Sequence, residues 1–176
     1  MTRVVQGLGA RSANAPSPVG GSRVTPSGDT PFELSTDAAR LDLAVVHDWL
    51  SGQTHWARGI ARATVERAFA HSLWVGAFVA HPAPQQVGVA RAISDQATFA
   101  YLCDVFVDEA WRGRGIARRM VEHLLHHPQL AGLRRVVLRS RDARGLYERL
   151  GFAPLPVPEL WMERPGSVAP AHVSAV

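Results

Sequence analysis

The segment VDEAWRGRGIARRM, residues 107–120, decides how this sequence is interpreted. An apolar stretch ends at Val107, a short loop follows, and the residues from Arg112 to Ala117 begin a helical pattern. Glycines let a backbone approach a ligand closely, and the free amides of a first helical turn point outward along a dipole that favours negative charge. We therefore predict that a pyrophosphate-sized anion binds where this strand gives way to a helix.

Apolar periodicity continues downstream of this junction. Ile116, Met120 and Leu124 recur every four residues and predict a helix, which Pro128 ends. Three further elements are expected: a short buried strand, a helix closed by a glycine in the left-handed conformation, and a final short strand, at residues 135–139, 143–150 with Gly151, and 160–163.

Upstream, three apolar runs separated by short turns predict successive antiparallel strands at residues 73–79, 87–93 and 98–107. Two amphipathic helices precede them. The first is marked by a cap, apolar residues four apart and a glycine stop: Thr36 or Asp37, then Leu41, Val45 and Trp49, then Gly52. The second has one apolar face and ends near His71: Ala61, Val65 and Phe69. With a short strand at residues 32–35, the predicted order is β-α-α-β-β-β-α-β-α-β.

Composition places the chain among globular proteins of one domain. It has 176 residues, 47% hydrophobic and 19% charged, and no apolar run approaches the roughly 18 residues of a membrane helix. All 19 basic residues are arginine, which excludes a Walker-type phosphate lysine and Schiff-base chemistry. The single cysteine, Cys103, excludes an intrachain disulfide and a multi-cysteine zinc site, and it fits the reducing cytoplasm, where we expect the protein.

Positive charge is concentrated in one segment. Residues 112–149 contain ten arginines and three acids, whereas the remainder contains nine arginines and twelve acids. Such a segment attracts anions, and the candidates are nucleic acid, an acidic membrane surface and a phosphate-bearing cofactor. A dinucleotide fingerprint is excluded, because its third glycine falls on Arg118 and no acid follows about 20 residues later. Nucleic-acid binding and a solvated, arginine-rich helix start stay open as alternatives.

The two ends of the chain lack apolar periodicity. Residues 1–30 are rich in Gly, Pro, Ser and Thr, and we interpret them as a disordered extension rather than a transit peptide or a secretion signal. Residues 165–176 are interpreted as a flexible tail. One folded domain is therefore expected at residues 31–164.

Two motifs resemble the Gcn5-related N-acetyltransferase (GNAT) superfamily. RGRGIA, from Arg112 to Ala117, matches its R/Q-x-x-G-x-G/A signature, and ARGLYERLGF, from Ala143 to Phe152, is similar to a later motif in the same order. The resemblance covers nearly all of residues 31–164 and is nearest to a branch of small bacterial members. It implies an α/β (α+β) fold, a mixed and mostly antiparallel twisted sheet flanked by about four helices, which agrees with the predicted order of elements.

The resemblance implies acetyl-coenzyme A (acetyl-CoA) as cosubstrate and no metal. The pyrophosphate would lie on the main-chain amides of Arg112, Gly113, Arg114, Gly115, Ile116 and Ala117. The pantetheine arm would meet the main chain of Val105, Phe106 and Val107, and also Ser140, which stands where many relatives have asparagine. The thioester would lie between this strand and residues 135–139, where a main-chain amide would stabilise the oxyanion formed by direct attack of an amine.

Two side chains are candidates for proton transfer. Tyr147 matches the family's usual general acid, since a phenol with a pKa of about 10 is a suitable proton source for a departing thiolate. Asp104 is expected on the opposite strand face from Cys103 and Val105, and it is either the base that deprotonates the amine or a structural hydrogen-bond acceptor. Cys103 lacks a basic partner and is not expected to be a nucleophile.

Several aromatic residues and histidines have weaker signals. His55 and Trp56 lie in the region that shapes the acceptor pocket in this fold, and packing in the core or at the rim is the alternative. Three histidines gather near a helix end, where interaction with the helix dipole accounts for them without a metal: His123, His126 and His127.

We therefore expect an N-acetyltransferase that moves an acetyl group from acetyl-CoA to the primary amine of a small molecule. Its partner is that small-molecule amine. Neither nucleic acid nor a membrane is an expected partner, and the resemblance allows a homodimer. The alternatives are a non-catalytic acyl-CoA sensor or interaction module, and a nucleic-acid-binding protein, whose affinity would depend steeply on salt.

Overall fold

The computed structural model describes residues 31–80 and 83–166. Five strands form one sheet in the order of the chain: β1 (Glu33–Ser35), β2 (Leu73–Val79), β3 (Gln85–Ser94), β4 (Phe99–Val107) and β5 (Arg135–Leu138). Neighbouring strands are antiparallel except β4 and β5, which are parallel. The predicted mixed, mostly antiparallel sheet is confirmed. The predictions for residues 1–30 and 167–176 lie outside the described residues.

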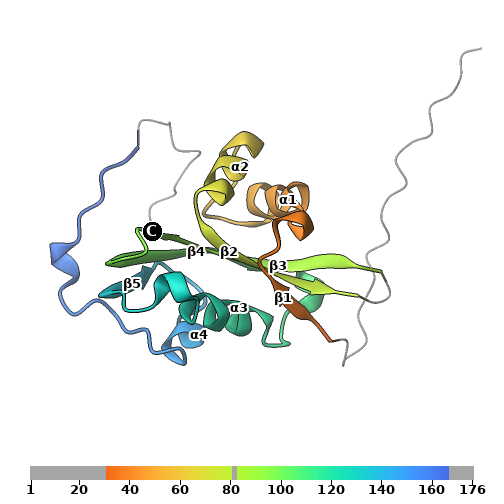
Figure 1. Cartoon of the computed structure of the whole chain (residues 1–176). Helices are drawn as coiled ribbons and strands as arrows, with labels where there is room; N and C mark the ends of the chain where they lie inside the picture. Colours follow the sequence, from red (N-terminus) through yellow and green to blue (C-terminus); the bar gives the residue numbers. More distant parts are fainter. Residues whose placement is uncertain (1–30, 81–82, 167–176) are drawn as a thin grey trace, which may run out of the picture.

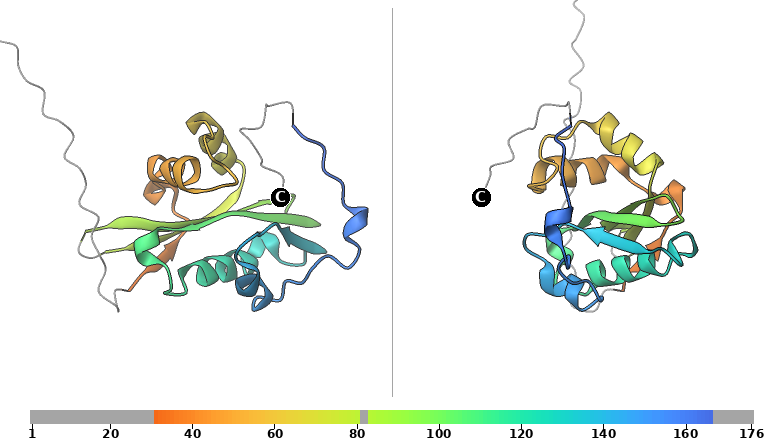
Figure 2. Two further views of the ribbon diagram at one scale, coloured as in Figure 1. Left: turned by 180° about the vertical axis from the view of Figure 1, so that it is seen from behind. Right: turned by 90° about the vertical axis from the view of Figure 1, so that its left-hand side faces the viewer.

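Four helices cover the two faces of the sheet: α1 (Leu43–Gln53), α2 (Arg62–Ala70), α3 (Ile116–Leu125) and α4 (Arg144–Glu148). Figure 1 shows α1 and α2 on one face and α3 and α4 on the other, and Figure 2 shows the same layers from two further sides. Short 3₁₀ turns link the elements, among them η2 (Glu109–Trp111) before α3 and η3 (Pro128–Leu130) after it. The strands and helices predicted from periodicity agree closely with these bounds.

Each face of the sheet has its own core. On the α3 side, Met120 and Leu124 are fully buried against small and branched residues of the strands. On the side of α1 and α2, Trp49 stacks on Phe106 of β4 with ring centroids 5.2 Å apart, and Phe69 belongs to the same core. Burial of apolar area on both faces fixes the side to which each strand residue points.

Two predictions are wrong: the start of the first helix and the presence of a final strand. Asp37 caps a 3₁₀ turn, η1 (Ala38–Arg40), whereas α1 begins later, at Leu43, because Asp42 accepts hydrogen bonds from two amides of its first turn. The final strand expected at residues 160–163 does not form. A proline-rich approach ends in the turn η4 (Pro158–Leu160), and the residues after it pair with no described strand. The amides of Leu160 and Trp161 donate within this turn, to Val157 O and Pro158 O.

A β-bulge interrupts β4. Phe106 pairs with Val89 and Cys103 pairs with Arg91, so two residues of β4, Asp104 and Val105, stand opposite one residue of β3. Asp104 has a φ of 51°, a left-handed conformation that aspartate tolerates better than most residues. The bulge corrects one expectation: Asp104 shares the face of Cys103 and Arg91, toward α1 and α2, while Val105 packs with the core on the α3 side.

Candidate active site

The two parallel strands part where the bulge begins. β4 and β5 pair from Phe99 with Arg135 as far as Leu102 with Leu138, and β4 then continues to Val107 with no described strand beside it on that side. Asp108 N donates to Val87 O at 2.9 Å, and Phe106 pairs with Val89, so these residues turn their main-chain groups toward β3. Because the direction alternates along a strand, the main chain of Val105 and Val107 faces the open side.

The open edge leads into a turn with a left-handed backbone. Gly113 and Gly115 have φ values of 77° and 74°, and a Cβ added at either position would meet no atom within 4 Å. The glycines are therefore required by backbone conformation and not by crowding. In the part of the chain that the structure describes, no acceptor meets the amides of Ile116, Ala117 and Arg118, and the α-helical ladder starts at the bond from Arg119 N to Gly115 O.

Arginine side chains surround this turn. Arg112 Nε donates to Val107 O at 3.0 Å, and its guanidinium lies 5.6 Å from the centre of the Phe106 ring. The guanidinium of Arg114 lies 5.1 Å from the centre of the Trp111 ring. Open amides, a helix N-terminus and two cations thus meet at one end of α3, an arrangement whose electrostatics favour an anion.

Tyr147 lies on α4, on the same side of the sheet as α3. Its ring contacts Phe152 edge-on at 5.9 Å between centroids and packs against the core on the α3 side. Burial raises the pKa of Tyr147, so the phenol stays protonated at neutral pH. Ser140, expected at the pantetheine arm, accepts a hydrogen bond from Ala143 N at 3.1 Å just before α4. Its hydroxyl hydrogen stays available for a further acceptor.

Asp104 sits in a hydrogen-bond network on the opposite face. Arg91 Nε and one terminal nitrogen donate to Asp104 Oδ2 at 2.8 and 2.6 Å, and both side chains are only 11% exposed. The other terminal nitrogen of Arg91 donates to Ser72 Oγ at 2.9 Å, and Trp56 Nε1 donates to Asp104 Oδ1 at 3.1 Å. A carboxylate this deeply placed needs such partners.

Comparisons with known proteins agree with this geometry. A family model described as an acetyltransferase (GNAT) domain matches residues 74–154. A crystal structure from Xanthomonas campestris pv. campestris, assigned to the GNAT acetyltransferases, is 47% identical, with 77% of this chain and 94% of that chain covered and a TM-score of 0.73. The chain belongs to the GNAT acetyltransferase family. It is an acyltransferase by that membership.

More distant structures share the GNAT fold. An acetyltransferase structure from Deinococcus radiodurans is 23% identical, with 70% of this chain and 83% of that chain covered and a TM-score of 0.58. Glucosamine-6-phosphate N-acetyltransferase from Arabidopsis thaliana is 16% identical, with 76% of this chain and 97% of that chain covered and a TM-score of 0.54. A comparison with curated proteins gave no match. Among the described residues of this GNAT protein, no helix has the length and hydropathy that a membrane crossing requires.

Arg91 is the site residue that sequence reasoning missed. It stands inside the apolar run of β3, and a charged residue there is a signal that a carboxylate lies across the strand pair. Trp56, placed at the acceptor region by sequence, donates to Asp104 and is 50% exposed. His55 meets the Trp56 ring edge-on with centroids 5.0 Å apart. Both residues are exposed, so neither belongs to the buried core.

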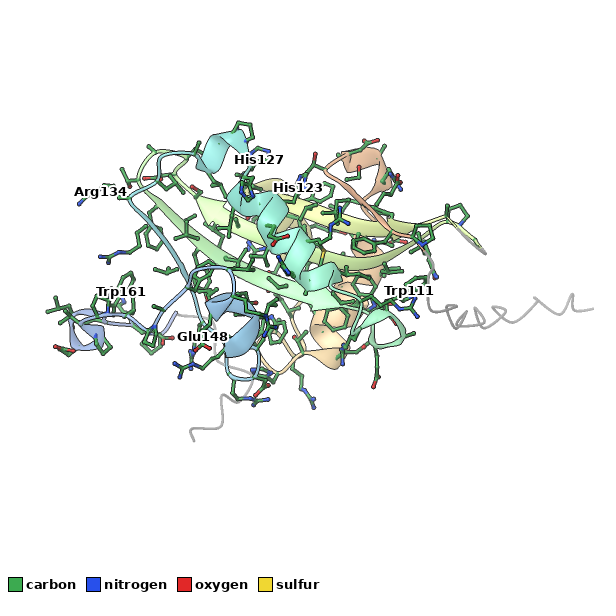
Figure 3. All side chains as sticks on the ribbon, turned by 90° about the horizontal axis from the view of Figure 1, so that it is seen from below. Trp111, His123, His127, Arg134, Glu148 and Trp161 are labelled. Carbon is green, nitrogen blue, oxygen red and sulfur yellow. The ribbon has the colours of Figure 1, made fainter. Side chains whose placement is uncertain are left out.

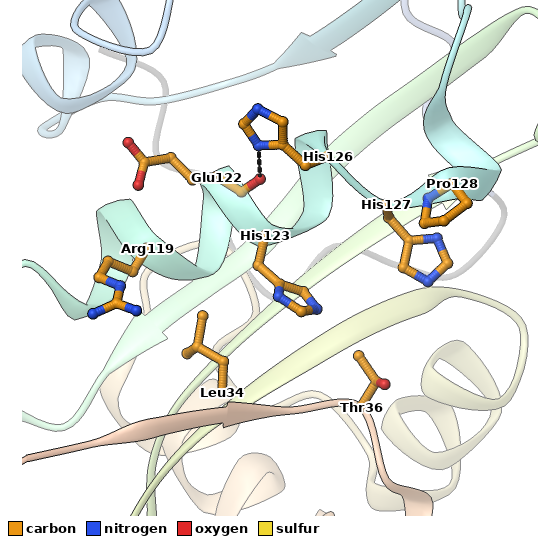
Figure 4. Close-up of a pocket in the computed structure, with 8 residues that line it drawn as sticks. All are labelled: Leu34, Thr36, Arg119, Glu122, His123, His126, His127 and Pro128. Atoms are coloured by element: carbon orange, nitrogen blue, oxygen red, sulfur yellow. Dashed lines mark hydrogen bonds between the residues drawn. The ribbon is translucent and has the colours of Figure 1, made fainter.

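The three histidines lie at the opposite end of α3 from the glycine turn, as Figure 3 shows for His123 and His127. They line a surface hollow of about 540 Å³ between β1 and α3, drawn in Figure 4. His126 Nδ1 is 2.7 Å from Glu122 O, and His127 Nδ1 accepts from Gln129 N at 3.2 Å. Within the residues described, no group of three or more metal-ligating side chains is arranged around an ion.

Proposed function

We propose that this GNAT protein transfers an acetyl group from acetyl-CoA to the primary amine of a small molecule. The observation that supports it best is the open edge of β4, which runs directly into the glycine turn at α3. One surface thus offers main-chain groups to an extended amide-containing arm and a cationic turn to the pyrophosphate at its end.

The residues present fit acetyl-CoA. The amides of Val105 and Val107 face the side where β4 and β5 part, and Val107 O is already bonded to Arg112. The amides of Ile116 to Arg118 are open to an anion, since no described residue accepts from them. When bound, acetyl-CoA supplies an activated thioester that a free amine attacks.

Three groups of this chain would act on the reaction, and two others would hold one of them in place. The Val105 amide donates to the carbonyl oxygen as negative charge develops on it, a role whose loss costs on the order of 10²–10³ in rate. As the amine nitrogen bonds to the carbonyl carbon and the carbon–sulfur bond breaks, Tyr147 gives its proton to the sulfur. Asp104 takes the proton that the amine loses, while Arg91 and Trp56 hold its carboxylate in place.

A thermal-shift titration with acetyl-CoA, followed by thiol release across a panel of amines, tests the proposal. We expect stabilisation by acetyl-CoA alone and a fall in kcat of roughly 10²–10⁴ in Tyr147→Phe with donor binding retained. Unchanged turnover in Tyr147→Phe would remove this residue as the acid. Donor binding without turnover on any amine would favour an acyl-CoA sensor over an enzyme.

A further inference from the structure

Among the described residues, α1 and α2 leave part of their face of the sheet uncovered near β5, beside the site. On β3, β4 and β5, the residues that pack against α3 include Ala92, Ala100, Leu102, Val136 and Leu138. Because side chains alternate along a strand, their neighbours point to the other face. These neighbours, with an aromatic residue of the C-terminal segment, form what we call the apolar platform: Ile93, Phe99, Tyr101, Val137 and Trp161.

The apolar platform is continuous and accessible. Ile93 pairs with Tyr101, and Tyr101 pairs with Val137, so the three form one row across the strands. Trp161 lies over Phe99 with centroids 6.4 Å apart, and Ile93 and Trp161 are 45% and 40% exposed. In the part of the chain described, none of the five belongs to either core. An exposed apolar surface beside a reaction centre is a binding surface for an apolar group.

Charge at the rim of the apolar platform defines the ligand further. Leu138 is the last β5 residue that pairs with β4, and Arg139 follows it. Arg139 therefore stands level with Cys103, the neighbour of Asp104, at the point where the two strands part. Its guanidinium is 79% exposed, and its nearest acidic partner, Glu163, is 3.9 Å away and 82% exposed. Arg91, by contrast, is held by Asp104. Arg135 is also exposed, and its guanidinium lies 5.4 Å from the centre of the Trp161 ring, but it pairs with Phe99 at the far end of β5. Of these two cations, Arg139 is the one that stands where the strands part, and it is able to take a carboxylate from a ligand there.

We infer that the acceptor is an α-amino acid with an aromatic or branched apolar side chain. This inference rests on the proposed function and names the substrate class of the same site. The carboxylate binds Arg139, the apolar side chain lies on the platform, and the amine between them lies toward Asp104 and the parting of the strands. A ligand with only an apolar group would leave Arg139 without a carboxylate, and a ligand with only a carboxylate would leave the apolar platform without a contact.

Three matched amines test the inference in thiol-release assays: L-phenylalanine, phenethylamine, which lacks the carboxylate, and glycine, which lacks the apolar body. We expect kcat/KM for phenylalanine to exceed that of each other amine by about tenfold or more. Phenethylamine lacks one charge-assisted contact and glycine lacks one buried side chain, and either contact is worth about that factor. Arg139→Gln should raise KM for phenylalanine by about tenfold and leave phenethylamine unchanged. Ile93→Ser should lower kcat/KM for phenylalanine and leave kcat/KM for glycine unchanged.

The matched control is Arg134→Gln. Arg134 is also exposed but precedes β5, and Figure 3 shows it directed away from the body of the molecule. It should change no acceptor's KM. Equal kcat/KM for all three amines, in enzyme that acetyl-CoA stabilises, would overturn the inference and leave the proposed function intact. Absence of both donor binding and thiol release would instead overturn the proposed function.

Discussion

Replacing Asp104 by asparagine tests how the bulge of β4 is held. Asparagine keeps the volume and an oxygen that accepts from Arg91, and it tolerates the left-handed conformation that Asp104 adopts at φ 51°. The substitution therefore removes one negative charge and one of the two acceptor oxygens, so either Arg91 or Trp56 loses its acceptor. What remains is the Arg91 guanidinium, 11% exposed, without its counter-ion.

The expected cost follows from that burial. Removing one partner of a buried ion pair costs about 3–5 kcal/mol, because the other charge is left uncompensated. Since asparagine retains a hydrogen bond, we expect the lower end, about 3 kcal/mol. For a domain of this size that corresponds to a fall in Tm of about 10 °C.

Chemical denaturation of the wild type, Asp104→Asn, Arg91→Met and the double variant measures the effect. Each single variant leaves one group unpaired, so the double variant should lose less stability than the sum of the two singles. Glu66→Gln, which breaks the exposed pair of Arg62 and Glu66, is the control and should leave the midpoint unchanged. Additive losses, or a loss below about 1 kcal/mol in Asp104→Asn, would show that water already screens the pair.

Three further outcomes follow from the same structure. Gly115→Ala should weaken acetyl-CoA binding by calorimetry, because alanine disfavours φ 74°, whereas Gly52→Ala, in a helix end with open space, should not. Burial raises the pKa of Cys103 to about 12, so iodoacetamide should alkylate it about a thousandfold more slowly in folded than in unfolded protein at pH 8. Burial also raises the pKa of Tyr147, so both the rate of acetyl transfer and the stability of the fold should fall only above about pH 10. In Tyr147→Phe, the fall in rate at alkaline pH should be absent.

Periodicity was sufficient for the regular elements of this fold. The four-residue spacing of Ile116, Met120 and Leu124 predicts α3, and all three side chains are buried in the structure. The sequence indicates the glycines of the turn before it as a place where backbone could approach a ligand, whereas their positive φ is a finding of the structure. These features depend on neighbours in the chain, and local sequence is enough to specify them.

The features that sequence did not predict depend on neighbours across the sheet. The bulge at Asp104 is set by the register of β4 against β3, and no spacing within β4 indicates two residues opposite one. The partner of Asp104, Arg91, lies 13 residues away on another strand. The absent strand at residues 160–163 has the apolar composition of one, but the amides of Leu160 and Trp161 donate within the turn η4 instead.

The bulge links the two halves of the proposed site. Without the extra residue, alternation would place Asp104 toward α3, among apolar side chains, and Val105 on the opposite face. With it, Asp104 meets Arg91 and Trp56 on the acceptor side, while Val105 turns its side chain to the α3 core and its main chain to the open edge. In the proposed mechanism, this inserted residue places the proton acceptor on one face of β4 and acetyl-CoA binding at its edge, so we expect a deletion that restores regular pairing to abolish both together.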